Sequence, residues 1–107
     1  MSFSETVMFR IGAPVAPVQA TLSAATSTAA VDALSAVTDG QPHLVVFNVD
    51  ARTRIAFGAS GLAAASATTG VAVPADGVYA LWMTKGVNSY YRAYSTAGGQ
   101  LTVWVSE

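Results

Sequence analysis

The sequence predicts an all-β protein, a small single-domain β-sandwich or barrel built from antiparallel strands. Runs rich in β-branched and aromatic residues recur along the chain, and short breaks with Gly, Pro, Asp or Asn separate them. Both Trp and all four Tyr fall in the C-terminal third, which must supply most of the large core side chains of this Ala-rich protein. A chain of 107 residues has room for one domain, so we expect residues 1–107 to fold as a unit.

The N-terminal stretch predicts a strand followed by an interruption. Apolar and other residues alternate over residues 6–11, which indicates a strand with one buried side. Pro14 and Pro17 follow, and neither can donate a hydrogen bond to a β-ladder. We therefore expect residues 12–17 to form a Pro-containing loop or arm, which either reaches toward a neighbour or lies on the domain's own surface.

Residues 18–37 are open to two interpretations. The many Ala residues favour a helix, which Thr26 or Ser27 would cap. Thr and Ser are frequent in the same segment, however, and the stretches 18–22 and 29–34 can both be extended. We expect two short strands here, closed by a turn before His43.

The strongest strand signal spans His43–Val49, whose nearly unbroken apolar run predicts a strand covered on both faces. Asp50-Ala51 then offers a tight turn. In the next run, Arg52–Phe57, the two Arg residues and Ala56 alternate with Thr53, Ile55 and Phe57, so the Arg side should face outward. We expect these two runs to pair as a central hairpin.

The last part of the chain predicts a three-stranded meander. Residues 62–69 have no β-periodicity and should form a loop, and a short strand and a Pro-x-x-Gly turn follow at 71–77. Three β-rich runs then cover residues 78–84, 88–95 and 100–106, separated by breaks that contain glycine. Gly98-Gly99 would supply the positive φ angles of a two-residue hairpin.

Composition excludes several classes of partner. The net charge is −1, and like charges form no run that could bind nucleic acid or an anionic membrane. The chain has no Cys, no apolar stretch long enough to span a membrane, and no N-terminal signal sequence. Only 10% of residues are charged, which leaves a small domain short of solubilising groups and favours association with other protein.

No residue pattern indicates catalysis, a cofactor or a metal. His43 is the only His, and no nucleophile elbow or phosphate-binding loop accompanies it. The six acidic residues are scattered, so they suggest neither an acid and base pair nor a ligand cluster. We therefore expect a protein that is not an enzyme.

The candidate site is an aromatic interface. If the aliphatic residues of the last strand face the core, Trp104 faces outward, and Tyr90, Arg92 and Tyr94 share one face of the preceding strand. Trp, Tyr and Arg are typical of protein-interface hot spots and also of sugar-stacking platforms. The alternative is that a second sheet or the N-terminal arm covers them. Pro14 and Pro17 of the arm complete the set of candidate interface residues.

Residues 43–106 resemble small all-β structural proteins of tailed bacteriophages, of the capsid decoration or head-associated type. The motifs are Val45-Val-Phe-Asn48, Ile55-Ala-Phe-Gly58, the small-residue stretch 63–69, Val73-Pro-Ala-Asp-Gly77 and Gly98-Gly-Gln-Leu-Thr-Val103. The resemblance implies a virion component, made in the host cytoplasm, that binds the major capsid protein or other virion proteins. It also implies a homo-oligomer, with a trimer favoured. A tail or head-tail connector component and a carbohydrate-binding or adhesin module are the alternatives.

Overall fold

The computed structural model describes residues 18–106, which form eight β-strands and no helix. The strands are β1 (Val18–Leu22), β2 (Val31–Asp32), β3 (His43–Val49), β4 (Thr53–Gly58), β5 (Val71–Val73), β6 (Val78–Met83), β7 (Tyr90–Tyr94) and β8 (Gly99–Val105). The expectation of two short strands within residues 18–37 is confirmed by β1 and β2. The strand and the Pro-containing arm predicted before residue 18 lie outside the described residues.

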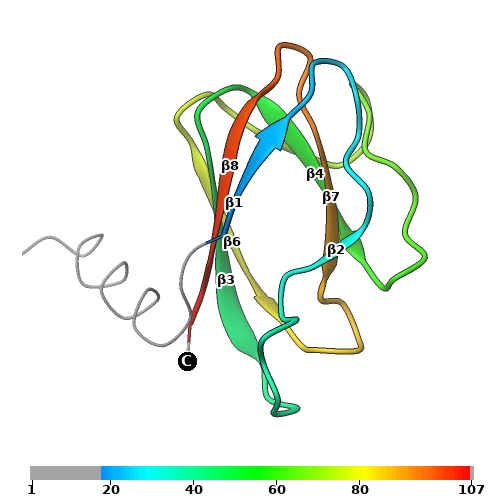
Figure 1. Ribbon diagram of the computed structural model, residues 1–107, viewed down its shortest axis with the longest axis vertical. Coiled ribbons are helices and arrows are strands. Elements are labelled where there is room, and N and C mark those ends of the chain that lie inside the picture. Colours follow the sequence, from blue (N-terminus) through cyan, green and yellow to red (C-terminus); the bar gives the residue numbers. More distant parts are fainter. Residues whose placement is uncertain (1–17, 107) are drawn as a thin grey trace, which may run out of the picture.

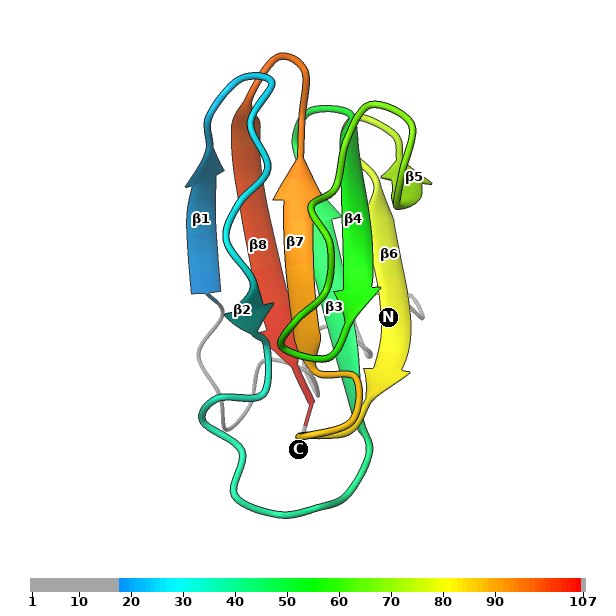
Figure 2. The same ribbon diagram turned by 90° about the vertical axis from the view of Figure 1, so that its right-hand side faces the viewer.

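The strands form two antiparallel four-stranded sheets that pack face to face, as Figures 1 and 2 show. The first sheet has the order β1-β8-β3-β6 and the second the order β2-β7-β4-β5. Strands pair as β1 with β8, β2 with β7, β3 with β6 and β4 with β5, like one long antiparallel ribbon rolled up on itself. This is the strand order of a jelly roll, so the predicted all-β sandwich class is confirmed.

Two predicted strand pairings are wrong. β3 and β4 belong to different sheets, so they form no hairpin, and the C-terminal runs β6, β7 and β8 alternate between the sheets instead of forming a meander. The strands themselves lie where the sequence placed them. The physical reason is that period-two alternation shows which side of a strand is buried but not which sheet the strand joins, and a short connection can either reverse within a sheet or cross between layers.

The turn that connects β3 in the first sheet to β4 in the second packs against the start of β8. The Asp50 carboxylate oxygen Oδ1 accepts a hydrogen bond from the backbone N–H of Gln100 at 2.8 Å. Gly98 and Gly99 have φ angles of 78° and 146°, and a Cβ on Gly99 would lie 2.5 Å from that carboxylate oxygen. The two glycines therefore do have the predicted positive φ angles, but they serve a crossing between layers and not a hairpin.

The core lies between the sheets and is centred on Phe47 of β3. Its ring makes edge contacts with Phe57 of β4 and Tyr91 of β7, at centroid distances of 5.2 Å and 5.0 Å. The inward-facing aliphatic residues around these rings include Val45, Val49, Ile55, Val73, Leu101, Val103 and Val105. Because the odd-numbered residues of β8 face this core, its even-numbered residues must face outward, as the sequence predicted for Trp104.

Candidate binding surfaces

One part of the outer side of the first sheet is apolar, whereas Gln19, Thr21, Asn48, Gln100 and Thr102 make the rest of that side polar. Strand alternation turns a continuous set of side chains away from the core, and the ladder places Val46 opposite both Trp104 and Ala80, and Leu44 opposite Trp82. We call this surface the apolar face; it consists of Leu44, Val46, Val78, Ala80, Trp82 and Trp104. None of the six residues is charged, so the face offers no ionic group for water to hydrate.

The exposed part of the apolar face lies on β6. Trp82 is 63% exposed and Val78 is 57% exposed, whereas Trp104 on β8 is half-buried. The indole Nε1 of Trp104 is buried and has no hydrogen-bond partner among the described residues. Because this atom is already buried, an acceptor on the surface of a partner cannot reach it without a rearrangement of the Trp104 side chain.

The predicted aromatic interface is divided between opposite sides of the molecule. Trp104 lies on the outer side of the first sheet, while Tyr90, Arg92 and Tyr94 lie on the outer side of the second. The expectation that they form one outward face is therefore wrong, because β7 and β8 belong to different sheets. Pro14 and Pro17 lie outside the described residues.

Trp82 is a surface residue that sequence reasoning did not single out. Its strand alternates regularly, but both sides of β6 are apolar, with Tyr79, Leu81 and Met83 on the side opposite Trp82. Nothing in the strand itself indicates which side is buried. The assignment follows only from the pairing of β6 with β3, whose inward residues are fixed by the core.

Arg92 is engaged in structural contacts. Its Nε donates to the carbonyl oxygen of Thr28 at 2.9 Å, and its Nη1 donates to that of Leu62 at 3.3 Å. The Thr28 hydroxyl oxygen in turn accepts the N–H of Ala93 at 3.0 Å. Arg92 thus holds two loops against the outer side of β7, and these two bonds use two of the five N–H donors of its guanidinium.

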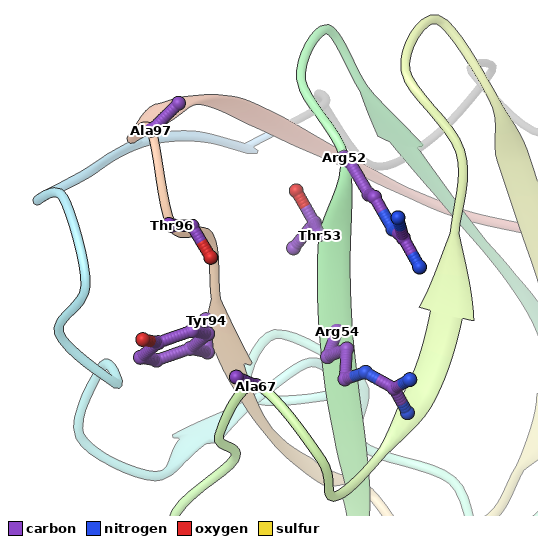
Figure 3. A pocket seen from close by; sticks show the side chains of 7 residues that line it. All are labelled: Arg52, Thr53, Arg54, Ala67, Tyr94, Thr96 and Ala97. Atoms are coloured by element: carbon purple, nitrogen blue, oxygen red, sulfur yellow. The ribbon is translucent and has the colours of Figure 1, made fainter.

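A cavity of about 290 Å³ lies beside Tyr94, where β4 begins and β7 ends. Figure 3 shows Arg52 and Arg54 on one side, Tyr94 extending to the other, and Thr96 near the rim. Arg54 donates from Nη1 to the carbonyl oxygen of Gly70 at 3.0 Å. Neither Arg forms an ion pair with a described carboxylate, since the one ion pair within residues 18–106 joins His43 and Asp39.

His43 sits in a structural site at the end of β3. Its Nδ1 lies 2.8 Å from the carbonyl oxygen of Ser106, and its Nε2 lies 2.8 Å from Oδ1 of Asp39. Both partners accept hydrogen bonds, so the doubly protonated imidazolium satisfies both at once. The bonds to Asp39 and to the Ser106 carbonyl raise the pKa of His43, and the bond from His43, followed by that from the Gln41 N–H, lowers the pKa of Asp39.

This site predicts a stability that depends on pH. Because the pKa of His43 is raised by folding, its contribution is complete below its ordinary pKa of about 6.5 and is lost as pH rises through the raised value. The contribution of Asp39 has the opposite sign and is lost only as pH falls through its lowered pKa. Urea unfolding should therefore show stability declining as the pH rises above about 6.5, and His43→Gln should remove that part of the slope. Identical slopes for the two proteins would contradict the assignment.

Within residues 18–106, no three side chains of His, Asp or Glu gather where they could hold a metal ion. The same residues include no helix that could cross a membrane. Comparison of the chain with protein-family models, with curated proteins and with solved structures found no match. The likeness to phage structural proteins therefore depends on the sequence motifs alone.

Proposed function

We propose that this protein is a non-enzymatic structural protein that binds other protein through its apolar face. The observation that carries the proposal is the exposure of Trp82 and Val78 on a surface without charge. Contiguous exposed apolar surface with a large aromatic residue is typical of protein-binding sites. A partner would remove this surface from water.

We further propose that the partner is a virion lattice, with the protein acting as a capsid decoration protein of a tailed phage. Two things support this assignment: the likeness of residues 43–106 to phage structural proteins, and the jelly-roll strand order, which recurs in viral capsid proteins. The second argument is an analogy at the level of fold. A protein that binds the assembled lattice but not its free subunits stabilises the lattice by mass action, and many weak copies add up.

Removal of the Trp104 side chain provides the direct test. We predict that Trp104→Ala weakens attachment to purified particles by about 2 kcal/mol, or about 30-fold, because a central Trp dominates such interfaces. Attachment is measured as protein that sediments with particles over a concentration series. Val87→Ala is the matched control, because Val87 is 67% exposed and apolar but lies outside the apolar face. Equal attachment of all three proteins would reject the apolar face as the binding surface.

The position in the virion is tested separately by copy number. A decoration protein should be present at hundreds of copies in a stained gel of purified virions, whereas a ring in the tail or head-tail connector should contribute about a dozen. About a dozen copies per virion would favour the tail or head-tail connector alternative. Absence of the protein from virions would exclude both positions.

A second candidate function is carbohydrate binding at the cavity beside Tyr94. The specific observation in its favour is the combination of an aromatic ring with two Arg residues that have no described carboxylate partner. This combination suits an acidic sugar, which would pair with Arg52 and contact the ring. Binding of the isolated protein to acidic glycans on an array, lost in Tyr94→Ala, would establish this activity, and an array without signal would exclude it.

A further inference from the structure

The four edges of the two sheets differ in how well they are protected. In the second sheet, β2 and β5 span only two and three residues, and Pro74 follows β5 directly. In the first sheet, the edge strand β1 has five residues and also contains no charge, Pro or Gly, but its outward side chains Gln19 and Thr21 are polar. The other edge, β6, has six residues and contains no charge, Pro or Gly. Short strands, charges and Pro are the devices that keep an edge from pairing with another chain, and β6 has none of them.

Within residues 18–106, no other strand pairs with the outer edge of the β6 backbone. The N–H of Val49 donates to the carbonyl oxygen of Gly77 at 3.1 Å, which fixes Gly77 as a residue bonded to β3. Since bonding alternates along an antiparallel strand, Val78, Ala80 and Trp82 must direct their N–H and C=O groups away from β3. No described strand lies beyond them. The one described contact is a long bond of 3.4 Å from the Asn88 side chain to the Trp82 carbonyl oxygen.

We propose that β6 pairs antiparallel with β6 of a second copy of this chain, around a two-fold axis at Ala80. Ala80 then lies opposite Ala80 of the second copy, and Val78 lies opposite Trp82 at both ends. All three residues with unpaired backbone groups find partners in this register. The two first sheets join into one continuous eight-stranded sheet, whose outer side carries two apolar faces next to each other.

The chemistry of β6 suits a copy of itself. From Pro74 to Tyr91 the only charged residues are Asp76, which precedes β6, and Lys85, which follows it. The two-fold register sets Asp76 of one copy opposite Thr84 of the other, while Lys85 donates to the carbonyl oxygens of Ser35 and Val37 in its own chain, so no like charges meet at either end. The paired residues between them are apolar or aromatic, and a strand without charge has no like-charge repulsion to overcome. Each copy thus presents a self-complementary surface, as a two-fold interface requires.

The edge pairing does not depend on the proposed function, although it would strengthen it. A dimer presents two apolar faces in fixed relation, so attachment to a repeating lattice becomes bivalent. The pairing uses the backbone edge of β6, whereas Trp104 lies on β8, two strands away in the sheet. Separate substitutions can therefore address the two surfaces.

The test is to replace Ala80, whose N–H points away from β3, so that Ala80→Pro removes an edge donor without removing a bond to β3. Ala80→Thr keeps the N–H and is the matched control. We expect sedimentation equilibrium to show a concentration-dependent dimer for the wild type and for Ala80→Thr. For Ala80→Pro we expect a dissociation constant raised at least about tenfold. The melting temperature of the Ala80→Pro monomer should remain close to that of the dissociated wild type.

Each other outcome overturns the edge pairing. A wild-type monomer at high micromolar concentration would reject it, and a large loss of melting temperature in Ala80→Pro would then show that part of the same chain occupies the edge. A dimer or a trimer that Ala80→Pro leaves intact would place the self-association elsewhere. Trp104→Ala should leave the dimer unchanged, so loss of particle binding in that variant tests the proposed function without testing the edge.

Discussion

Replacing Phe47 by Ala is expected to lower the free energy of unfolding by about 3–5 kcal/mol. Phe47 is fully buried, and its ring touches the rings of Phe57 and Tyr91 in the opposite sheet. The substitution removes these contacts and leaves a cavity between the two layers, where the sheets cannot close fully around it. The total free energy of unfolding of a native protein is only about 5–15 kcal/mol, so the variant should be close to unfolding.

Urea unfolding followed by Trp fluorescence measures this change. Leu44→Ala is the control from the same strand, because Leu44 lies on the outer side of the sheet and is half-buried. We expect Leu44→Ala to lower the free energy of unfolding by about 1 kcal/mol, because it removes one aliphatic side chain that is only partly buried. Equal losses in the two variants would mean that the inner and outer sides of β3 have been assigned incorrectly.

Arg92→Ala is expected to destabilise the protein by about 3 kcal/mol, because hydrogen bonds to charged groups contribute about 1.5–3 kcal/mol each. Its two bonds, to the carbonyl oxygens of Thr28 and Leu62, join segments that are far apart in the sequence to the same strand. Loss of the guanidinium should release both loops from the second sheet. Arg92→Lys can restore at most part of this, since an ammonium group lacks the planar arrangement of donors.

Chemical denaturation again provides the measurement, with Arg54→Ala as the matched control. Arg54 lies on the same side of the same sheet but makes a single hydrogen bond, to the Gly70 carbonyl oxygen. Its loss should cost about 1 kcal/mol or less. If instead Arg92→Ala retained full stability and lost binding to another protein, Arg92 would be an interface residue after all.

Local pattern was sufficient to locate most strands and to orient several of them. Leu101, Val103 and Val105 alternate with polar or aromatic residues, so the inward side of β8 was predictable, and with it the outward position of Trp104. The pairing of strands was not predictable, because it depends on partners far away in the sequence. Val18 pairs with Val103, and no property of either residue specifies the other.

The candidate surfaces show the same division between local and non-local information. Tyr90, Arg92 and Tyr94 do share one side of their strand, as alternation predicted. Whether they share a surface with Trp104 depends on which sheet each strand joins. The role of Arg92 depends on Thr28 and Leu62, which lie 64 and 30 residues away in the sequence. Trp82 escaped notice because both sides of its strand are apolar, and only the long-range pairing with β3 separates them.

The rolled-ribbon topology has a consequence for the order of events when the chain folds. Only β4 and β5 are partners that are also neighbours in the sequence, whereas every other pair closes a longer loop, up to the pairing of Val18 with Val103. Such non-local pairing makes β-proteins fold over milliseconds to seconds, slowly for their size. β8 also lies between β1 and β3, so among the described strands β1 has no neighbour in its sheet until β8 has been synthesised. The first sheet therefore remains divided until β8 joins β1 to β3, and this part of the fold is completed late.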